Sequence, residues 1–208
     1  MPEPGEPGTS LIGKDRLEAL IDGIFAFSMT LLVTTLILPR AGPVPGTSVA
    51  ALIALFPDFY HYIIAFFVLA AFWLGHHEQF RRIHHADRGL LSLNILTLFF
   101  VTLVPFSTSF IGDYDGDPVS TILFELNLMI LGLLFLAQWY SISRKRHLVS
   151  ADLTEQDIRV RMTRNLIIPA ISLAGILLAV AGFGSSTMIY MATPFVQHAV
   201  DRYFRNRG

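Results

Sequence analysis

Two histidine pairs eight residues apart, His76-His77 and His84-His85, are the side chains that most suggest chemistry. Imidazole is the common protein ligand of zinc and copper. On one helix the two pairs would lie about 12 Å apart along the axis, which is too far to bind one ion. The chain has no Cys, which excludes disulfides and thiolate ligands. We therefore expect no metal site, and interpret His76 and His77 as hydrogen-bonded packing residues and Trp73 as a packing or interface aromatic.

Two carboxylates, Asp22 and Glu125, interrupt long apolar segments. If these segments cross a bilayer, a charged group in them suggests by default an ion or proton path. The alternative for Asp22 is a hydrogen bond to His76, His77 or Asn94 that locks neighbouring helices together, and we favour this structural role. For Glu125 we expect a place near the outer membrane interface.

The composition indicates that these polar groups lie in a membrane protein rather than in a soluble domain. Of 208 residues, 53% are hydrophobic and only 15% are charged, and the mean hydropathy is +0.56. An ordinary soluble domain has about a quarter charged residues. The formal net charge of −1 gives no electrostatic reason to bind nucleic acid. No H-E-x-x-H helix, paired aspartate site or G-x-S-x-G turn is present, so we expect neither an enzyme nor a cofactor.

Gaps between charged residues locate the helices, because about twenty mainly apolar residues cross the hydrocarbon core. Pro57 separates a short apolar stretch, VAALIALF, from the second gap, which predicts a short interfacial helix there. The last gap, 165–200, contains the break signal Gly-Phe-Gly-Ser-Ser and predicts two helices joined by a tight turn. We predict a disordered cytoplasmic tail at 1–14, a six-span transmembrane channel domain at 15–204 and a cytoplasmic tail at 205–208. The spans are expected at about 15–38, 58–83, 88–111, 118–143, 164–182 and 186–204.

The distribution of basic residues supports six spans. Lys and Arg gather on the cytoplasmic side of membrane proteins, and six spans place 14 of the 15 basic residues there, with only Arg40 outside. Five spans would export three C-terminal arginines. The expected fold is therefore an all-α, multi-pass protein of the cell inner membrane with both termini in the cytoplasm.

Three stretches resemble one known family: RLEALIDGIFAFSMTLLV in the first span, FWLGHHEQFRRI at the end of the second and LLSLNILTLFFVTLVPFST in the third. They are similar to bacterial members of the potassium channels called transmembrane protein 175. The family's R-x-x-x-F-S-D motif is kept at Arg16 and Asp22, but Leu20 and Ile21 replace its Phe and Ser. Ile21 lacks the hydroxyl that contributes to the family's polar network.

The resemblance implies a homotetramer of six-helix subunits whose first helices line a central pore without a Thr-Val-Gly-Tyr-Gly filter. It implies a potassium-permeable channel whose partners are copies of itself, membrane lipids and monovalent cations. A proton-conducting channel or a proton-coupled secondary transporter is the alternative. Carried over without gaps, the apolar constriction falls on Phe27 and Leu31, and the hydroxyl layer on Thr30 and Thr34. A structural or gating polar network is expected from Arg16, Asp22, His76, His77 and Asn94.

Helix geometry is consistent with that pore assignment. At about 100° per residue, Phe27, Thr30, Leu31, Thr34 and Leu38 lie about 80–180° round from Asp22. They form one stripe that points away from the carboxylate. The alternative for Thr34 and Thr35 is a hydroxyl that bonds back to the preceding turn.

Overall fold

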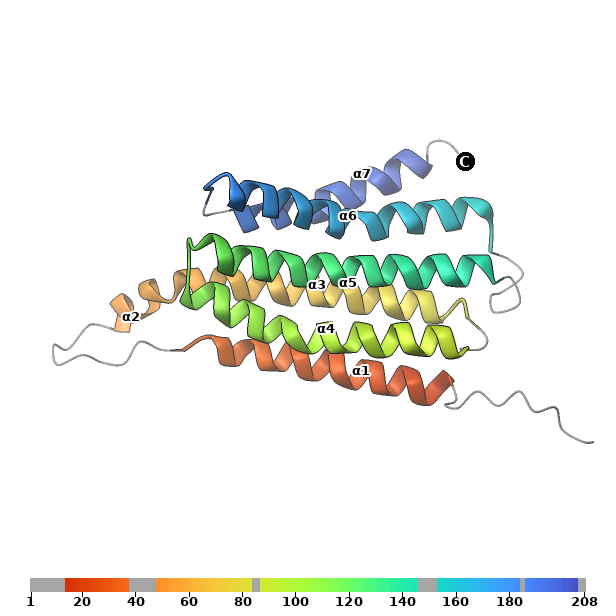
Figure 1. Ribbon diagram of the computed structural model, residues 1–208, viewed down its shortest axis with the longest axis horizontal. Coiled ribbons are helices and arrows are strands. Elements are labelled where there is room, and N and C mark those ends of the chain that lie inside the picture. The colour runs from red at the N-terminus through yellow and green to blue at the C-terminus, as the bar shows by residue number, and fades with distance from the viewer. Residues whose placement is uncertain (1–13, 38–47, 84–86, 146–152, 184–185, 206–208) are drawn as a thin grey trace, which may run out of the picture.

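The computed structural model describes residues 14–37, 48–83, 87–145, 153–183 and 186–205. All of the regular structure in these residues is helical and forms an elongated bundle (Figure 1). The elements are α1 (Lys14–Leu31), η1 (Leu32–Thr35), α2 (Ser48–Ala54), α3 (Phe56–Phe80), α4 (Arg88–Asp113), α5 (Pro118–Arg144), α6 (Glu155–Val180), η3 (Ser186–Ala192) and α7 (Thr193–Arg205).

Local sequence signals explain where the long helices begin. Asp87 caps α4, accepting a hydrogen bond from the Leu90 amide at 2.8 Å. Asp117 caps α5 in the same way, and Pro118 follows in the first turn, where its missing N–H costs nothing. The short helix predicted before Pro57 is present as α2, and its place at the membrane interface remains a prediction. These starts agree with the spans expected from the sequence.

Helix α6, which contains the fifth predicted span, begins nine residues before that span, at Glu155 rather than at residue 164. Thr154 and Asp157 form a capping box, in which each side chain accepts from the other residue's backbone amide. The segment of mixed charge before residue 164 is therefore the first two turns of α6. The helix ends as expected near Gly182, whose positive φ of 89° allows the chain to leave the helix.

Apolar side chains between the long helices form one continuous core. Its largest fully buried members include Phe25, Phe80, Phe124 and Trp139, contributed by α1, α3 and α5. Helices α5 and α6 approach closely at Gly132, because glycine has no side chain. A Cβ atom at this position would overlap the ring of Pro169. In Figure 1, α1 lies along one side of the bundle, and α6 and α7 lie along the opposite side.

Five of the described helical segments are long and apolar enough to cross a membrane: 14–35, α3, α4, α5 and α6. The sixth predicted span instead consists of η3 followed by α7, which we call the C-terminal segment (Ser186–Arg205). It runs back along α6, since Gln156 Nε2 in the first turn of α6 donates to the carbonyl of Phe204 at 3.3 Å. Whether this segment crosses the membrane remains a prediction.

Candidate functional site

Helix α1 has one buried face and one uncovered face. Leu17, Ile21, Phe25, Ser28 and Leu32 are buried against the bundle, mainly against α3 and α4. Their spacing of three to four residues makes a single seam, which lies at about 220–300° when Asp22 is set to 0°. The stripe predicted to face a pore lies at about 80–180°. It therefore falls outside the buried seam.

The side chains of the predicted pore stripe are accessible in the subunit. Phe27 is 61% exposed, Thr30 and Thr34 are exposed, and Leu31 is half-buried. Leu38, at the end of the stripe, lies outside the described residues. A row of apolar and hydroxyl side chains thus covers a surface that no other described element of the chain occupies.

Both threonine hydroxyls of the stripe donate to the preceding turn of their own helix. Thr30 Oγ1 donates to the carbonyl of Phe27 at 2.8 Å, and Thr34 Oγ1 donates to that of Leu31 at 2.6 Å. A hydroxyl has one proton and two lone pairs. With the proton held in the helix, the remaining lone pairs face outward. Such an oxygen suits a cation better than an anion.

Asp22 is bound to α3 by a residue that sequence reasoning missed. Trp73 Nε1 donates to Asp22 Oδ1 at 2.9 Å. One turn away, His77 Nδ1 lies 3.5 Å from Glu18 Oε1. Two carboxylates four residues apart on α1 therefore face two ring nitrogens four residues apart on α3. We call this arrangement the α1–α3 ladder.

The other predicted members of the polar network lie elsewhere. His76 is buried, and its Nε2 lies 3.0 Å from Asn94 Oδ1, so this pair joins α3 to α4 rather than holding Asp22. Arg16 is exposed, and its side chain makes no hydrogen bond or ion pair with another described residue. Ile21, where the family has Ser, is only 1% exposed and contributes an apolar contact to the core. The five predicted residues do not form one connected network.

Metal ligation finds no support in the described part of the chain. Among those residues, no three His, Asp or Glu side chains are grouped so that they could hold an ion. His84 and His85 lie outside the described residues.

Glu125 is fully enclosed by the helices around it, and its depth in the membrane remains a prediction. Its side chain is 0% exposed, and Tyr190 Oη donates to Oε2 at 2.6 Å. Ser172 Oγ lies 2.7 Å from the same tyrosine oxygen. Since the single tyrosine proton goes to Glu125, Ser172 must be the donor in the second bond. This chain of three side chains, the Glu125 cluster, ties η3 to α5 and α6.

Comparisons with known proteins give a consistent result. The family model described as endosomal/lysosomal potassium channel TMEM175 matches residues 16–105. A potassium channel of Streptomyces collinus is 34% identical over 137 residues, which are 64% of this chain and 66% of that channel. The human endosomal/lysosomal proton channel TMEM175 is 31% identical over 139 residues, or 62% of this chain and 28% of that protein. The chain thus spans just under two thirds of the first relative, and far less of the second.

A solved structure resembles most of the chain. It is the crystal structure of a lysosomal potassium-selective channel TMEM175 homolog from Chamaesiphon minutus, with a TM-score of 0.74. The match covers 93% of this chain and 97% of that chain at 23% sequence identity. At this identity the likeness concerns the fold.

Proposed function

The chain belongs to the TMEM175 family, and from this premise we propose that it is a potassium-permeable cation channel. Four copies would surround a central pore, with α1 of each subunit facing the axis. The observation that carries the proposal is the face of α1 that no other described element covers. Phe27 lies on this face together with two threonine oxygens whose protons are donated to backbone carbonyls. The matching relative from Streptomyces collinus is named a potassium channel, which supports the choice of ion.

Conduction through such a pore would depend on side chains instead of backbone carbonyls. Apolar constrictions in channels control passage by excluding water. Four copies of Phe27 and Leu31 would form that constriction. Oxygens of Thr30 and Thr34 would replace part of the water that an ion sheds there. Because few oxygens are available at each level, we expect only modest selectivity between potassium and sodium.

A sixth membrane crossing is part of this proposal, and the length of the C-terminal segment supports it. A 3₁₀-helix rises about 2.0 Å per residue and an α-helix about 1.5 Å. Seven residues of η3 and thirteen of α7 therefore reach about 33 Å. This matches the hydrocarbon thickness of about 30 Å. With six crossings, both termini lie on the cytoplasmic side of the cell inner membrane.

The ladder and the His76–Asn94 pair have a supporting role in this proposal. Both fix α3 against a neighbouring helix, and the ladder holds α1 directly. A change in either contact would reorient the pore-facing stripe. We therefore assign these residues to structure or gating, and not to ion binding.

Proton conduction is the second candidate function. It is favoured by the matching human relative, which is named a proton channel. The two candidates differ in what carries the current. A flux assay that supplies potassium, sodium and protons separately distinguishes them.

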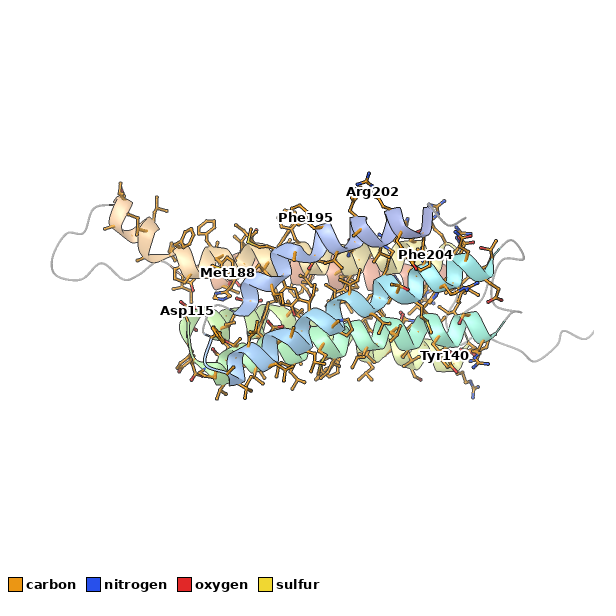
Figure 2. All side chains as sticks on the ribbon, turned by 90° about the horizontal axis from the view of Figure 1, so that it is seen from above. Asp115, Tyr140, Met188, Phe195, Arg202 and Phe204 are labelled. Atoms are coloured by element: carbon orange, nitrogen blue, oxygen red, sulfur yellow. The ribbon has the colours of Figure 1, made fainter. Side chains whose placement is uncertain are left out.

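The test is ion flux into liposomes that contain the purified full chain. Phe27→Ala widens the proposed constriction and should raise potassium flux or reduce the preference for potassium over sodium. Phe195→Ala is the matched control, because Phe195 is also highly exposed but points outward from α7 (Figure 2). Equal effects of the two substitutions, or a conducting protein indifferent to Phe27→Ala, would refute the placement of Phe27 in the pore.

The hydroxyl layer has its own matched pair of variants. Thr30→Val removes the oxygen with little change in volume and should lower potassium flux about fivefold to tenfold, as expected for the loss of an oxygen ligand worth about 1 kcal/mol. Thr102→Val is the control, since the Thr102 hydroxyl is exposed on α4 and also donates to the preceding turn, to Phe99 at 2.8 Å. A loss of flux in the control alone would contradict the assignment.

A further inference from the structure

Three hollows along α3, α6 and α7 join into one groove, which we call the lateral groove. The first, of about 390 Å³, lies near the N-terminal end of α6 and is lined by Arg82, Arg164 and Phe204 among others. The second, of about 160 Å³, shares Glu78, Arg161 and Arg164 with the first. The third, of about 380 Å³, shares Ala71, Ile168 and Gln197 with the second. The shared residues show that the three hollows lie next to one another along α3.

The two ends of the lateral groove differ in chemistry. Among the described residues, the end near Arg164 is lined by the arginines Arg82, Arg161 and Arg164 and the carboxylates Glu78 and Asp157, whose charges sum to +1. Arg161 pairs with Glu78, and Asp157 caps α6. The far end is lined mainly by apolar side chains of α3 and η3: Ile63, Ile64, Phe67, Val68, Tyr190 and Met191. A ligand that fits both ends has a negative head and an apolar tail.

The length of the groove matches one leaflet of a membrane. Along α3 it extends from Glu78 to Ile63, which is about 22 Å at 1.5 Å per residue. Half of the hydrocarbon core is about 15 Å thick, and the headgroup region adds several ångströms. Arg164 is the last charged residue before a long uncharged run of the chain, so it marks the boundary between these regions.

We propose that the lateral groove binds one anionic phospholipid per subunit, with its phosphate at Arg82 and Arg164 and one acyl chain beside Ile64 and Met191. A single phosphodiester neutralises the net charge of the arginine-rich end. Arginine presents a planar fork of N–H groups that matches phosphate oxygens. Basic pockets between membrane helices on the cytoplasmic side are known to bind anionic headgroups.

The position of the groove favours a lipid over a second copy of the chain. The groove follows α6 and α7, which lie on the side of the bundle opposite α1 (Figure 1). A tetramer built around α1 would leave this side facing the membrane. The inference itself does not require conduction, because a subunit that passes no ions would still bind the lipid.

Native mass spectrometry of the purified full chain tests the proposal by counting bound lipids. Phosphatidylglycerol should bind at one molecule per subunit, and phosphatidylcholine should bind more weakly. Arg82→Gln combined with Arg164→Gln should weaken phosphatidylglycerol binding by about fivefold for each arginine, from the usual contribution of a basic residue near an anionic lipid. Arg202→Gln is the charge-matched control, since Arg202 is exposed and points away from α6 (Figure 2).

A second variant tests the tail independently of charge. Ala71 lies where the polar and apolar hollows meet, so Ala71→Trp should block the acyl chain and also reduce binding at least fivefold. This variant keeps every arginine and covers the case in which the double arginine variant does not fold. Each variant is compared with the native chain by its elution volume and melting temperature.

Five outcomes would overturn the proposal. Equal binding of the two lipids, or an equal effect of Arg202→Gln, would show only general surface attraction. Displacement of phosphatidylglycerol by millimolar inorganic phosphate would indicate a headgroup site without a tail. Unchanged binding in Ala71→Trp would remove the acyl chain from the groove. Dissociation of the oligomer by Ala71→Trp would indicate that a second copy of the chain covers it.

Discussion

Tyr190→Phe is the substitution whose effect follows most directly from the structure. It removes one oxygen from the Glu125 cluster and leaves the ring in place. Glu125 Oε2 then loses its donor, and Ser172 loses its acceptor. Glu125 Oε1 has no hydrogen-bond partner among the described residues even in the native chain. The carboxyl group would therefore be buried without a described partner for either oxygen.

The expected cost can be estimated from these contacts. Leaving a buried acceptor without its donor costs about 1–3 kcal/mol. For a chain of this size, each kcal/mol lowers the melting temperature by about 2–4 °C. Tyr190→Phe should thus lower the melting temperature by about 6 °C in detergent micelles. Tyr60→Phe is the matched control: Thr187 donates to Tyr60 Oη at 3.4 Å, which is longer than an ordinary O–H···O hydrogen bond, so the loss should stay under about 2 °C.

A double variant separates the cost of burying a carboxyl group without a hydrogen-bond donor from the other effects of Tyr190→Phe. Met has nearly the shape of Glu and no charge, so Glu125→Met in the Tyr190→Phe background removes the group that has lost its partner. Replacing both partners of a hydrogen bond with apolar groups is often close to neutral. The double variant should therefore melt above Tyr190→Phe alone. If it melts at the same temperature or lower, the reasoning about Glu125 is refuted.

Two further predictions concern packing and topology. Gly132→Ala should lower the free energy of unfolding by about 1–3 kcal/mol, because the added methyl overlaps the Pro169 ring where α5 meets α6. Gly75→Ala, with open space around it, should be neutral or stabilising by up to about 1 kcal/mol. A thermal melt of each variant measures both effects. The native chain has no Cys, so a single introduced cysteine is the only site that a maleimide can label. Arg144→Cys and Arg202→Cys should react with an impermeant maleimide added on one side of the membrane. Asp115→Cys should react only when the reagent is added on the other side. Labelling of Arg202→Cys together with Asp115→Cys would indicate five crossings.

Helix positions were predictable from the sequence wherever a local signal sets them. Asp117 and Pro118 mark the start of α5, and Asp87 marks that of α4, to the residue. The start of α6 was not predicted, because the span was placed by charge spacing, which reports membrane depth and not helix formation. The signal was present, since Thr154 and Asp157 have the spacing of a capping box. The C-terminal segment was harder, because hydropathy does not indicate a 3₁₀-helix.

Site residues were predictable in their angular position but not in their partners. The 3.6-residue period is a local property, so it identified the stripe of Phe27, Thr30 and Thr34 on an uncovered face of α1. A hydrogen bond between Asp22 and Trp73 joins residues 51 apart, and no local pattern reports it. The hydrogen bond to Glu125 was not predictable for the same reason, since its donor Tyr190 lies 65 residues later.

The α1–α3 ladder nevertheless left a trace in the sequence. Asp22 pairs with Trp73, and Glu18, four residues earlier, pairs with His77, four residues later. This reversed order is what two antiparallel helices with matching one-turn spacing require. On α1 the two carboxylates lie at about 320–360°, next to the buried seam at 220–300° and away from the stripe at 80–180°. The apolar seam and the ladder therefore fix the rotation of α1 together, and that rotation turns Phe27 and the threonine oxygens outward.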